Sequence, residues 1–288
     1  MRKDPDFMLP VTKNRLPSYT FKIPRGHMNH PKQTAIVTGA AQGIGRRTAE
    51  LLSENGYAVA LVDLRPSTGV SAALREKGRA VLDFQGDISD EATVIECAAK
   101  VEREWGHIDL LVNNAGISCI SPAEETSVQQ FRRVLEINLT APFILAKTFG
   151  PKMIARGKGS IVNVASIAGL VGIADRTAYN ASKHGLIGLT RTLAAEWGAR
   201  GVRVNAVCPG WVKTEMDAAD QSSGGYTDDD IIRRVPMARF AAPADIAEAI
   251  LFLADGNRSG FVNGHTLVVD GGWTSDGSWE SLRLRHRP

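Results

Sequence analysis

The chain has 288 residues, 43% of them hydrophobic, which is enough for one large α/β domain with a substantial core. Its formal net charge is +3 at pH 7, but residues 1 to 33 hold seven Lys/Arg against Asp4 and Asp6, so the remaining chain carries 27 basic and 29 acidic residues. This near-neutral body has no basic stripe, and we therefore expect no nucleic-acid partner.

The spacing of cysteines and histidines and the length of apolar runs bear on disulfides, metal sites and membrane spans. The three cysteines, Cys97, Cys119 and Cys208, are widely spaced and indicate reduced thiols in a cytoplasmic protein. The six histidines show no metal-ligand spacing, so we expect no metal site. No apolar run approaches the roughly 20 residues that span a bilayer, which predicts a protein without a membrane partner.

Residues 1–31 are predicted to be a disordered N-terminal extension. Five prolines in this segment exclude a long helix, because proline lacks a backbone donor and clashes with the preceding turn. A transit peptide is the rival interpretation, and Asp4 and Asp6 argue against it. A start at Met28 is a second alternative, because the first predicted strand begins within a few residues of it.

From residue 32 onward, short β-rich apolar runs alternate with helical patterns. Seven strands are predicted, at 34–38, 58–62, 80–84, 109–112, 160–164, 202–207 and 266–269. The helical patterns lie between them, at 44–55, 68–77, 90–105, 127–155, 178–199 and 243–254.

This alternation predicts right-handed βαβ crossovers and hence a doubly wound α/β fold, the Rossmann fold, with a seven-stranded parallel sheet. A ligand should bind beyond the carboxyl ends of its strands. We assign residues 32–274 to this single domain and 275–288 to a C-terminal tail. The interval 213–240, rich in Ser, Gly and Asp, interrupts the rhythm and is predicted to be a mobile flap.

A glycine-rich turn follows the first predicted strand and opens the first helix. Glycines there let the backbone turn tightly and approach a pyrophosphate, which the helix N-terminus attracts. An acidic residue, Asp63, ends the second strand, where it would bind ribose hydroxyls. The arrangement predicts dinucleotide binding by Gly39, Gln42, Gly43, Ile44, Gly45 and Asp63.

The spacing of these glycines resembles that of the short-chain dehydrogenase/reductase family. Further matches are Asn113-Asn114-Ala115-Gly116 after the fourth strand and the pair Tyr179 and Lys183, and the resemblance spans residues 32 to 273. It points to the branch of 3-oxoacyl reductases and polyol dehydrogenases. The resemblance implies that the adenine contacts Asp87 and that the rest of the cofactor lies against Asn114, Gly116, Tyr179, Lys183, Pro209, Gly210, Val212 and Thr214.

The residues near the adenosine ribose favour NAD over NADP. A 2′-phosphate against Asp63 would meet a like charge in a partly desolvated cleft. NADP-dependent relatives usually carry a basic residue where this chain has Gln42 or Leu64, and Arg65 is the one complication. We therefore expect NAD as the cofactor.

Tyr179 and Lys183 are four residues apart on a predicted helix and so share one face. The ammonium is expected to favour the tyrosine phenolate, which makes Tyr179 a usable general base. Ser166, at the end of the fifth strand, would polarise the substrate oxygen. The resemblance adds Asn138 as the fourth catalytic residue, ordering a water that links Lys183 to solvent.

These roles predict hydride transfer between NAD and a secondary alcohol or ketone, with oxidation of the alcohol as the favoured direction. The expected substrate pocket contains Ser118, Ser166, Ile167, Tyr179 and Trp211, and the acidic flap favours a small polyol, sugar or similar alcohol. A 3-oxoacyl thioester reductase is the alternative within this enzyme class. A non-catalytic nucleotide sensor is the alternative from another class, and the complete set of four catalytic residues argues against it.

The resemblance further implies a homotetramer built by pairing the helices at 127–155 and 178–199. The tail after residue 274 contains Trp279, Leu282 and Leu284. Because large apolar side chains are seldom left to solvent, we expect this tail to lie at a subunit interface.

Overall fold

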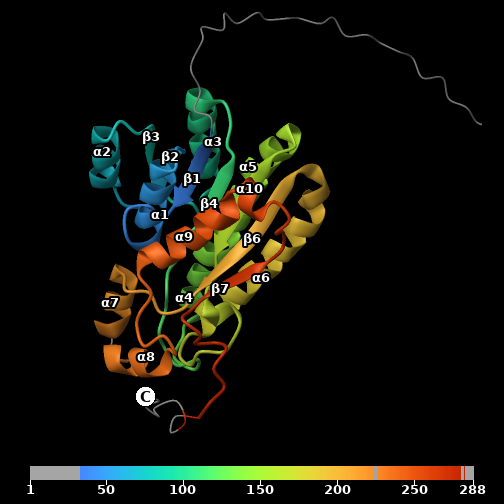
Figure 1. Ribbon diagram of the computed structural model, residues 1–288. Helices are drawn as coiled ribbons and strands as arrows, with labels where there is room; N and C mark the ends of the chain where they lie inside the picture. Colours follow the sequence, from blue (N-terminus) through green and yellow to red (C-terminus); the bar gives the residue numbers. More distant parts are fainter. Residues whose placement is uncertain (1–32, 223–225, 280–281, 283–288) are drawn as a thin grey trace, which may run out of the picture.

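The computed structural model describes residues 33–222, 226–279 and 282. Their strands form one parallel sheet in the order β3-β2-β1-β4-β5-β6-β7 (Figure 1). The strands are β1 (Thr34–Thr38), β2 (Ala58–Asp63), β3 (Val81–Gln85), β4 (Leu110–Asn113), β5 (Gly159–Val164), β6 (Val202–Pro209) and β7 (Thr266–Val269). The order reverses direction at β1, as in a doubly wound sheet. The predicted fold class is confirmed.

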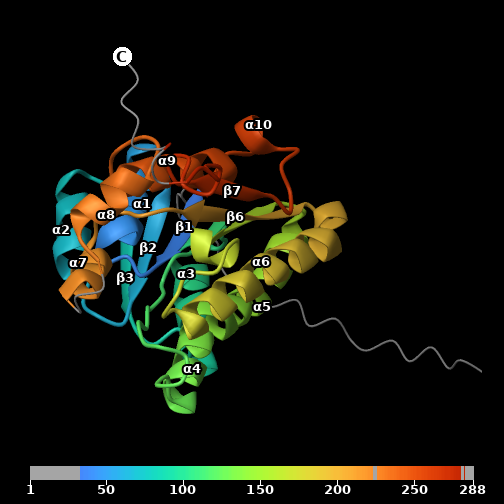
Figure 2. The ribbon, with the colours of Figure 1, turned by 90° about the horizontal axis from the view of Figure 1, so that it is seen from below.

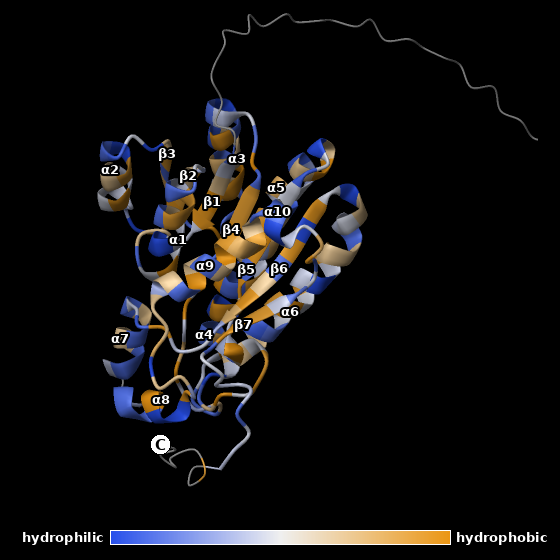
Figure 3. Cartoon of the chain, in the orientation of Figure 1, coloured by the Kyte–Doolittle hydropathy of each residue, from blue (hydrophilic) through white to orange (hydrophobic). Residues whose placement is uncertain are grey.

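Helices cover both faces of the sheet (Figure 2). One face is covered by α1 (Gly43–Glu54), α2 (Thr68–Glu76) and α9 (Pro243–Ala254), which share an apolar cluster with Ala35 and Val37 of β1. On the opposite face Ile36 joins the cluster of α3 (Glu91–Trp105), α5 (Ala141–Arg156) and α6 (Thr177–Trp197). Successive residues of one strand thus pack into two cores, which explains why the strands are largely apolar (Figure 3).

The predicted helix at 127–155 is in fact three segments. α4 (Val128–Leu135) is followed by a π-helical turn, η1 (Glu136–Thr140), and then by α5. Pro142 has no N–H to donate to the carbonyl of Asn138 four residues earlier, so a regular α-helix cannot close its hydrogen bond there. The interruption therefore falls on the residue that the family resemblance marks as catalytic.

The interval predicted as a flap contains two helices that the sequence pattern missed. α7 (Glu215–Ser222) and α8 (Asp228–Arg234) lie at the carboxyl end of the sheet and are largely hydrophilic (Figures 1 and 3). α8 begins with a capping box in which Thr227 and Asp230 satisfy each other's backbone N–H groups. The term flap is kept below for residues 213–240. A short α10 (Gly256–Ser259) precedes β7.

Both chain ends extend outside the described residues, and the predictions for residues 1–31 fall there entirely. Of the C-terminal tail, residues 275–279 and 282 are described. Asp276 contacts the flap of its own chain, because its carbonyl accepts a hydrogen bond of 3.1 Å from Arg234. A subunit contact of the tail stays a prediction. Among the described helices, none is both long and apolar enough to cross a membrane.

Candidate active site

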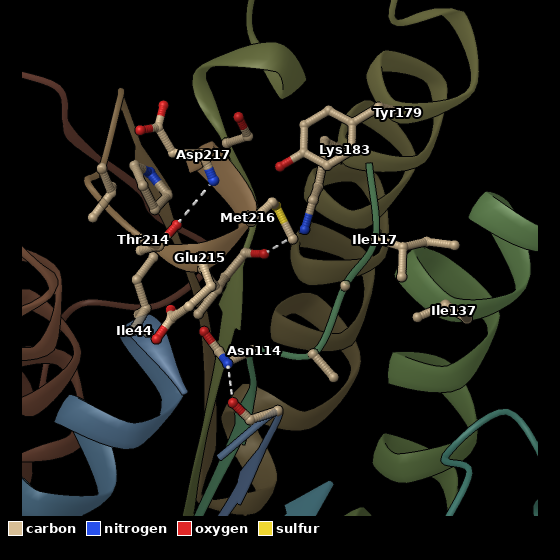
Figure 4. Close-up of a pocket in the computed structure, with 18 of the residues that line it drawn as sticks. Ile44, Asn114, Ile117, Ile137, Tyr179, Lys183, Thr214, Glu215, Met216 and Asp217 are labelled. Carbon is tan, nitrogen blue, oxygen red and sulfur yellow. Dashed lines mark hydrogen bonds between the residues drawn. The ribbon is translucent and has the colours of Figure 1, made fainter. Parts of the chain in front are cut away.

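A cavity of about 440 Å³ opens at the carboxyl ends of the strands, between the sheet and the flap. In Figure 4, Tyr179 and Lys183 enter it from α6, opposite Ile44, Thr214 and Glu215. The predicted site residues that line it are Gly39, Gln42, Gly43, Ile44, Asp63, Asp87, Asn114, Gly116, Ser166, Ile167, Tyr179, Lys183, Pro209, Gly210, Trp211, Val212 and Thr214.

The turn between β1 and α1 needs its glycines for two different reasons. Gly39 and Gly43 have φ values of +66° and +53°, a region that side-chain-bearing residues rarely adopt. A Cβ on Gly45 would lie only 2.1 Å from the carbonyl oxygen of Gly39. Gly45 is not among the residues that line the cavity, so its contribution is to let the turn pack against the helix.

Asn114 fixes the end of β4 against this turn. Its Nδ2 donates to the carbonyls of Thr38 at 2.8 Å and Gly39 at 3.2 Å, and its backbone N–H donates to Thr38 Oγ1 at 3.0 Å. The floor of the predicted cofactor site is therefore tied together across two neighbouring strands.

The Asp63 carboxylate is held in place at the end of β2. Backbone N–H groups of Ala41 and Arg65 each donate to one of its oxygens at 2.9 Å. Arg65 Nε lies 3.8 Å from the same carboxylate, and the Arg65 side chain is 58% exposed. A buried, oriented carboxylate thus lies where the ribose is predicted, with an exposed cation outside it.

Asp87 is paired with an arginine that sequence reasoning missed. Arg133 of α4 lines the cavity and approaches Asp87 Oδ2 to 3.0 Å, while Ser89 Oγ donates to the other oxygen at 2.6 Å. Burial disfavours the charged form, but the bonds from Ser89 and Arg133 outweigh it and lower the pKa of Asp87. Arg133 lies 46 residues from Asp87 in the chain, so no local pattern connects them.

Lys183 is buried beside Tyr179 on α6. Its Nζ lies 5.5 Å from the centre of the Tyr179 ring and donates to the Val164 carbonyl at 2.8 Å. Burial lowers the pKa of this ammonium from 10.5 to about 8. The group therefore still carries its proton at neutral pH, on the same helix face as the phenol, as the spacing predicts.

The expected lowering of the Tyr179 pKa is not what the structure shows. Burial raises the pKa of the phenol above its ordinary 10, while a hydrogen bond with Ser166 and the charge of Arg176 act in the opposite direction. The Lys183 ammonium lies 5.5 Å from the centre of the ring. The sequence argument considered the neighbouring charge and left out the desolvation of the phenol.

Ser166 lies two residues after the end of β5 and caps a short 3₁₀ turn, η2 (Ile167–Gly169). Its Oγ accepts a hydrogen bond of 3.1 Å from the Ala168 N–H. The cap orients the hydroxyl, which acts to lower the pKa of Tyr179, and both of these predicted catalytic residues line the cavity.

Asn138 lies behind the cavity in η1. Its side chain pairs with both the N–H and the carbonyl of Ile117 at 2.9 Å and donates to Ser182 Oγ at 3.1 Å. Gly116 lies between Asn138 and Lys183. A Cβ at this position would be 3.2 Å from Asn138 Oδ1 and 3.6 Å from Lys183 Nζ. The proposed water link through Asn138 stays a prediction.

The predicted substrate end combines apolar walls with charges. Trp211 forms an edge-on contact with Tyr226 of the flap at 4.9 Å between ring centres, and Ile167 is buried beside Ser166. Ser118 does not line the cavity. Its hydroxyl accepts a hydrogen bond of 2.9 Å from Arg176 instead.

Several lining residues were not predicted from the sequence. Arg176 precedes Tyr179 by three residues, and that helical spacing was the one signal that could have placed it in the site. The others come from strand ends, from the loops and helices that follow them, and from the flap, whose helices were not recognised. They include Ile173, Glu215, Asp217, Asp220 and Tyr226. Among the described residues, no group of three or more His, Cys, Asp or Glu is placed to hold a metal ion.

Comparison with known proteins places this site in context. Residues 39–274 match a family model described as enoyl-(acyl carrier protein) reductase. The chain is 41% identical over 244 residues to D-threitol dehydrogenase of Mycolicibacterium smegmatis, covering 84% of this chain and 93% of the relative. It is 42% identical over 246 residues to cis-4-hydroxycyclohexanecarboxylate dehydrogenase of Sinomonas cyclohexanicum, covering 85% and 97%.

Among solved structures, the fold resembles that of a protein from Beutenbergia cavernae assigned as an NAD(P)-dependent gluconate 5-dehydrogenase, with NADP bound at low occupancy. The TM-score is 0.80 at 38% identity, and the match covers 85% of this chain and 98% of that one. Fold, pocket and relatives define an oxidoreductase that acts on alcohols. The chain belongs to the short-chain dehydrogenase/reductase family.

Proposed function

We propose that this protein is an NAD-dependent dehydrogenase that oxidises a secondary hydroxyl group of a small polyol or sugar-type alcohol. The observation that carries the proposal is the meeting of Ser166, Tyr179 and Lys183 in the cavity that Asp63 and the glycine turn also line. Proton transfer and cofactor binding would then take place at two ends of one cavity.

The residues around the glycine turn fit a dinucleotide. The close approach of Gly45 to Gly39 leaves backbone N–H groups at the start of α1, where a pyrophosphate would bind. Asp63 would accept hydrogen bonds from the ribose hydroxyls, and Lys183 would hold the nicotinamide ribose. When bound, NAD supplies the acceptor for the hydride.

The chain's own residues would move the proton. Tyr179 Oη takes the proton of the substrate hydroxyl as the C–H bond breaks, and the reverse step returns it to a ketone. Ser166 Oγ donates a hydrogen bond to the reacting oxygen and so stabilises the charge that develops there. Lys183 supplies a nearby positive charge that favours the phenolate.

The choice of NAD rests on the charge at the ribose. Asp63 is oriented by two backbone donors, and a 2′-phosphate would have to approach this carboxylate closely. Arg65 acts in the opposite direction and favours NADP, because its exposed side chain could pair with a 2′-phosphate. The Beutenbergia cavernae protein binds NADP, so the preference needs a direct measurement.

The two alternative functions are a thioester reductase and a nucleotide sensor without catalysis. The matching family model is described as an enoyl-(acyl carrier protein) reductase, which favours a thioester substrate. Asp217 and Asp220 oppose it, because both line the cavity and would repel an anionic carrier. A nucleotide sensor without catalysis would need no Ser166, Tyr179 and Lys183 grouped at the cavity.

The test is a panel of polyols, sugars, simple secondary alcohols and a 3-oxoacyl thioester, followed by NADH absorbance in both directions. We expect NAD reduction by at least one small polyol. Turnover of the thioester alone would favour the reductase, and tight NADH binding without turnover of any compound would favour the sensor.

A further inference from the structure

Arg176 is a buried cation at the substrate end of the cavity. It lies directly before α6 and is 7% exposed. Its Nη1 donates to Ser118 Oγ at 2.9 Å and to Asp220 Oδ2 at 2.8 Å, and its guanidinium carbon lies 5.5 Å from the centre of the Trp211 ring. One side chain thus connects the loop after β4, the flap helix α7 and the aromatic wall.

The pair formed by Arg176 and Asp220 is itself mostly shielded from water. The exposed fractions of the two side chains are 9% and 16%. Within the described part of the chain both polar contacts of Arg176 use Nη1, so its Nε–H and Nη2 donors are the ones left to meet a ligand. Arg176 and Asp220 also act on Tyr179 with opposite signs, which places both within electrostatic range of the reacting oxygen.

The balance of charge at this end is not cationic. Asp217 also lines the cavity, accepts a hydrogen bond of 3.0 Å from Tyr226 and lies 3.2 Å from Lys213. Lys213 also approaches Asp228 to 2.5 Å and does not line the cavity. Among the described residues that line this end of the cavity, the two carboxylates of Asp217 and Asp220 flank the single guanidinium of Arg176, so the cation is not free to hold an anion alone.

We propose that Arg176 and Asp220 together recognise a second hydroxyl group of a neutral polyol, next to the carbon that is oxidised, and discriminate against a carboxylate at that position. A hydroxyl group both donates and accepts hydrogen bonds, so it satisfies a guanidinium and a carboxylate at once. A carboxylate only accepts, and it would face the like charges of Asp220 and Asp217. The inference rests on the proposed alcohol dehydrogenase activity and names its substrate class.

The comparisons leave this question open, because one relative is named for a neutral polyol and the two other proteins for hydroxy acids. Selectivity should therefore be measured on matched pairs. We suggest a tetritol and the tetronate of the same configuration, together with a secondary alcohol of four carbons that has one hydroxyl group. The wild type should oxidise the tetritol with a kcat/KM at least about tenfold above that of either other compound.

Asp220→Asn tests the rejection of carboxylates, because it keeps the side-chain shape and removes one negative charge. We expect the preference for tetritol over tetronate to fall by about tenfold, chiefly through a lower KM for the tetronate. Asp229→Asn is the matched control, because this carboxylate is 75% exposed on α8 and should leave the preference unchanged.

Arg176→Leu tests recognition of the second hydroxyl group. It should slow both alcohols to some extent, because the charge of Arg176 also acts on Tyr179, but it should lower kcat/KM for the tetritol by about tenfold or more beyond its effect on the single-hydroxyl alcohol. NADH binding and the thermal unfolding midpoint show whether Arg176→Leu still folds. If it does not, Asp220→Asn alone tests the inference.

The outcomes separate this inference from the proposed function. If no alcohol reduces NAD, both fail. If alcohols are oxidised but the tetronate equals or exceeds the tetritol, or if Asp220→Asn leaves the preference unchanged, the proposed function survives and this assignment of Arg176 and Asp220 is overturned.

Discussion

At the scale of single residues, Asp63 is the side chain on which the cofactor preference depends. We expect the wild type to favour NAD over NADP by at least about tenfold in kcat/KM, and Asp63→Ser to remove most of that preference. The same substitution would free Arg65 from the nearby carboxylate to meet the 2′-phosphate. Kinetics with both cofactors measure the change.

Combining Asp63→Ser with Arg65→Ala provides the control for this prediction. The gain in NADP use should shrink in the double variant, because the cation that pairs with the phosphate is gone. Equal wild-type kinetics with NAD and NADP would contradict the assigned role of Asp63.

The second residue-scale prediction concerns protonation of Tyr179. Burial raises its pKa, so in the cofactor-free protein the phenol should lose its proton only above pH 10. The ultraviolet difference between wild type and Tyr179→Phe, titrated with alkali, isolates this group among the four tyrosines. A transition below pH 10 in the free protein would contradict the effect of burial.

With NAD in excess, the rate of alcohol oxidation should rise with pH, because the phenolate is the base, and should level off below about 10. When bound, the positive nicotinamide ring would favour the phenolate, and the Lys183 ammonium would add to this effect at pH values below its own pKa of about 8. If the rate instead falls as the pH rises from about 6 to about 8, a phenolate base is excluded.

Many of the residues that motifs predicted for the site line one cavity, and several of them do so because they follow a strand at a fixed point. Asp63 ends β2 and Asn114 directly follows β4, and the carboxyl ends of parallel strands share one edge of the sheet. Arg133 and Arg176 could not be found in this way, because their partners lie 46, 44 and 58 residues away in the chain. Such pairings depend on tertiary packing alone.

At the scale of elements, the flap helix α7 borders the glycine turn. A Cβ on Gly43 would lie 3.4 Å from Glu215 Oε2, so a carboxylate stands beside the backbone predicted to bind the pyrophosphate. Glu215→Gln should therefore tighten NADH binding by about twofold to tenfold, and more at low ionic strength.

Fluorescence titration with NADH measures this effect, with Asp229→Asn as a control for a lost charge elsewhere on the flap. Unchanged or weaker binding by Glu215→Gln at low ionic strength would show that the carboxylate does not act on the cofactor site.

Element boundaries were predicted best where burial dominates. The strands matched within two residues, because buried parallel strands are continuous apolar runs bounded by turns. The flap helices were missed because they are short and polar, and α8 depends on its Thr227 cap. The π-helical turn at Asn138 was missed because hydrophobic periodicity does not report a single widened turn.

At the scale of the whole molecule, we propose a homotetramer. Val128 of α4 is 64% exposed and Phe143 of α5 is 47% exposed, both on the segment 127–155 that is predicted to pair between subunits. Light scattering at micromolar concentration should give four times the chain mass, and Phe143→Glu should give a smaller species with its fold retained. A wild-type monomer would contradict the proposal.

The central claim, alcohol oxidation by proton transfer to Tyr179, is tested most directly by comparing turnover of wild type and Tyr179→Phe on the best polyol of the panel. The phenylalanine ring keeps its packing and loses the one atom that takes the proton. Turnover should fall by at least about 10² to 10⁴, with NADH affinity and the unfolding midpoint nearly unchanged. A phenylalanine variant that turns over as fast as the wild type would show that another group is the base.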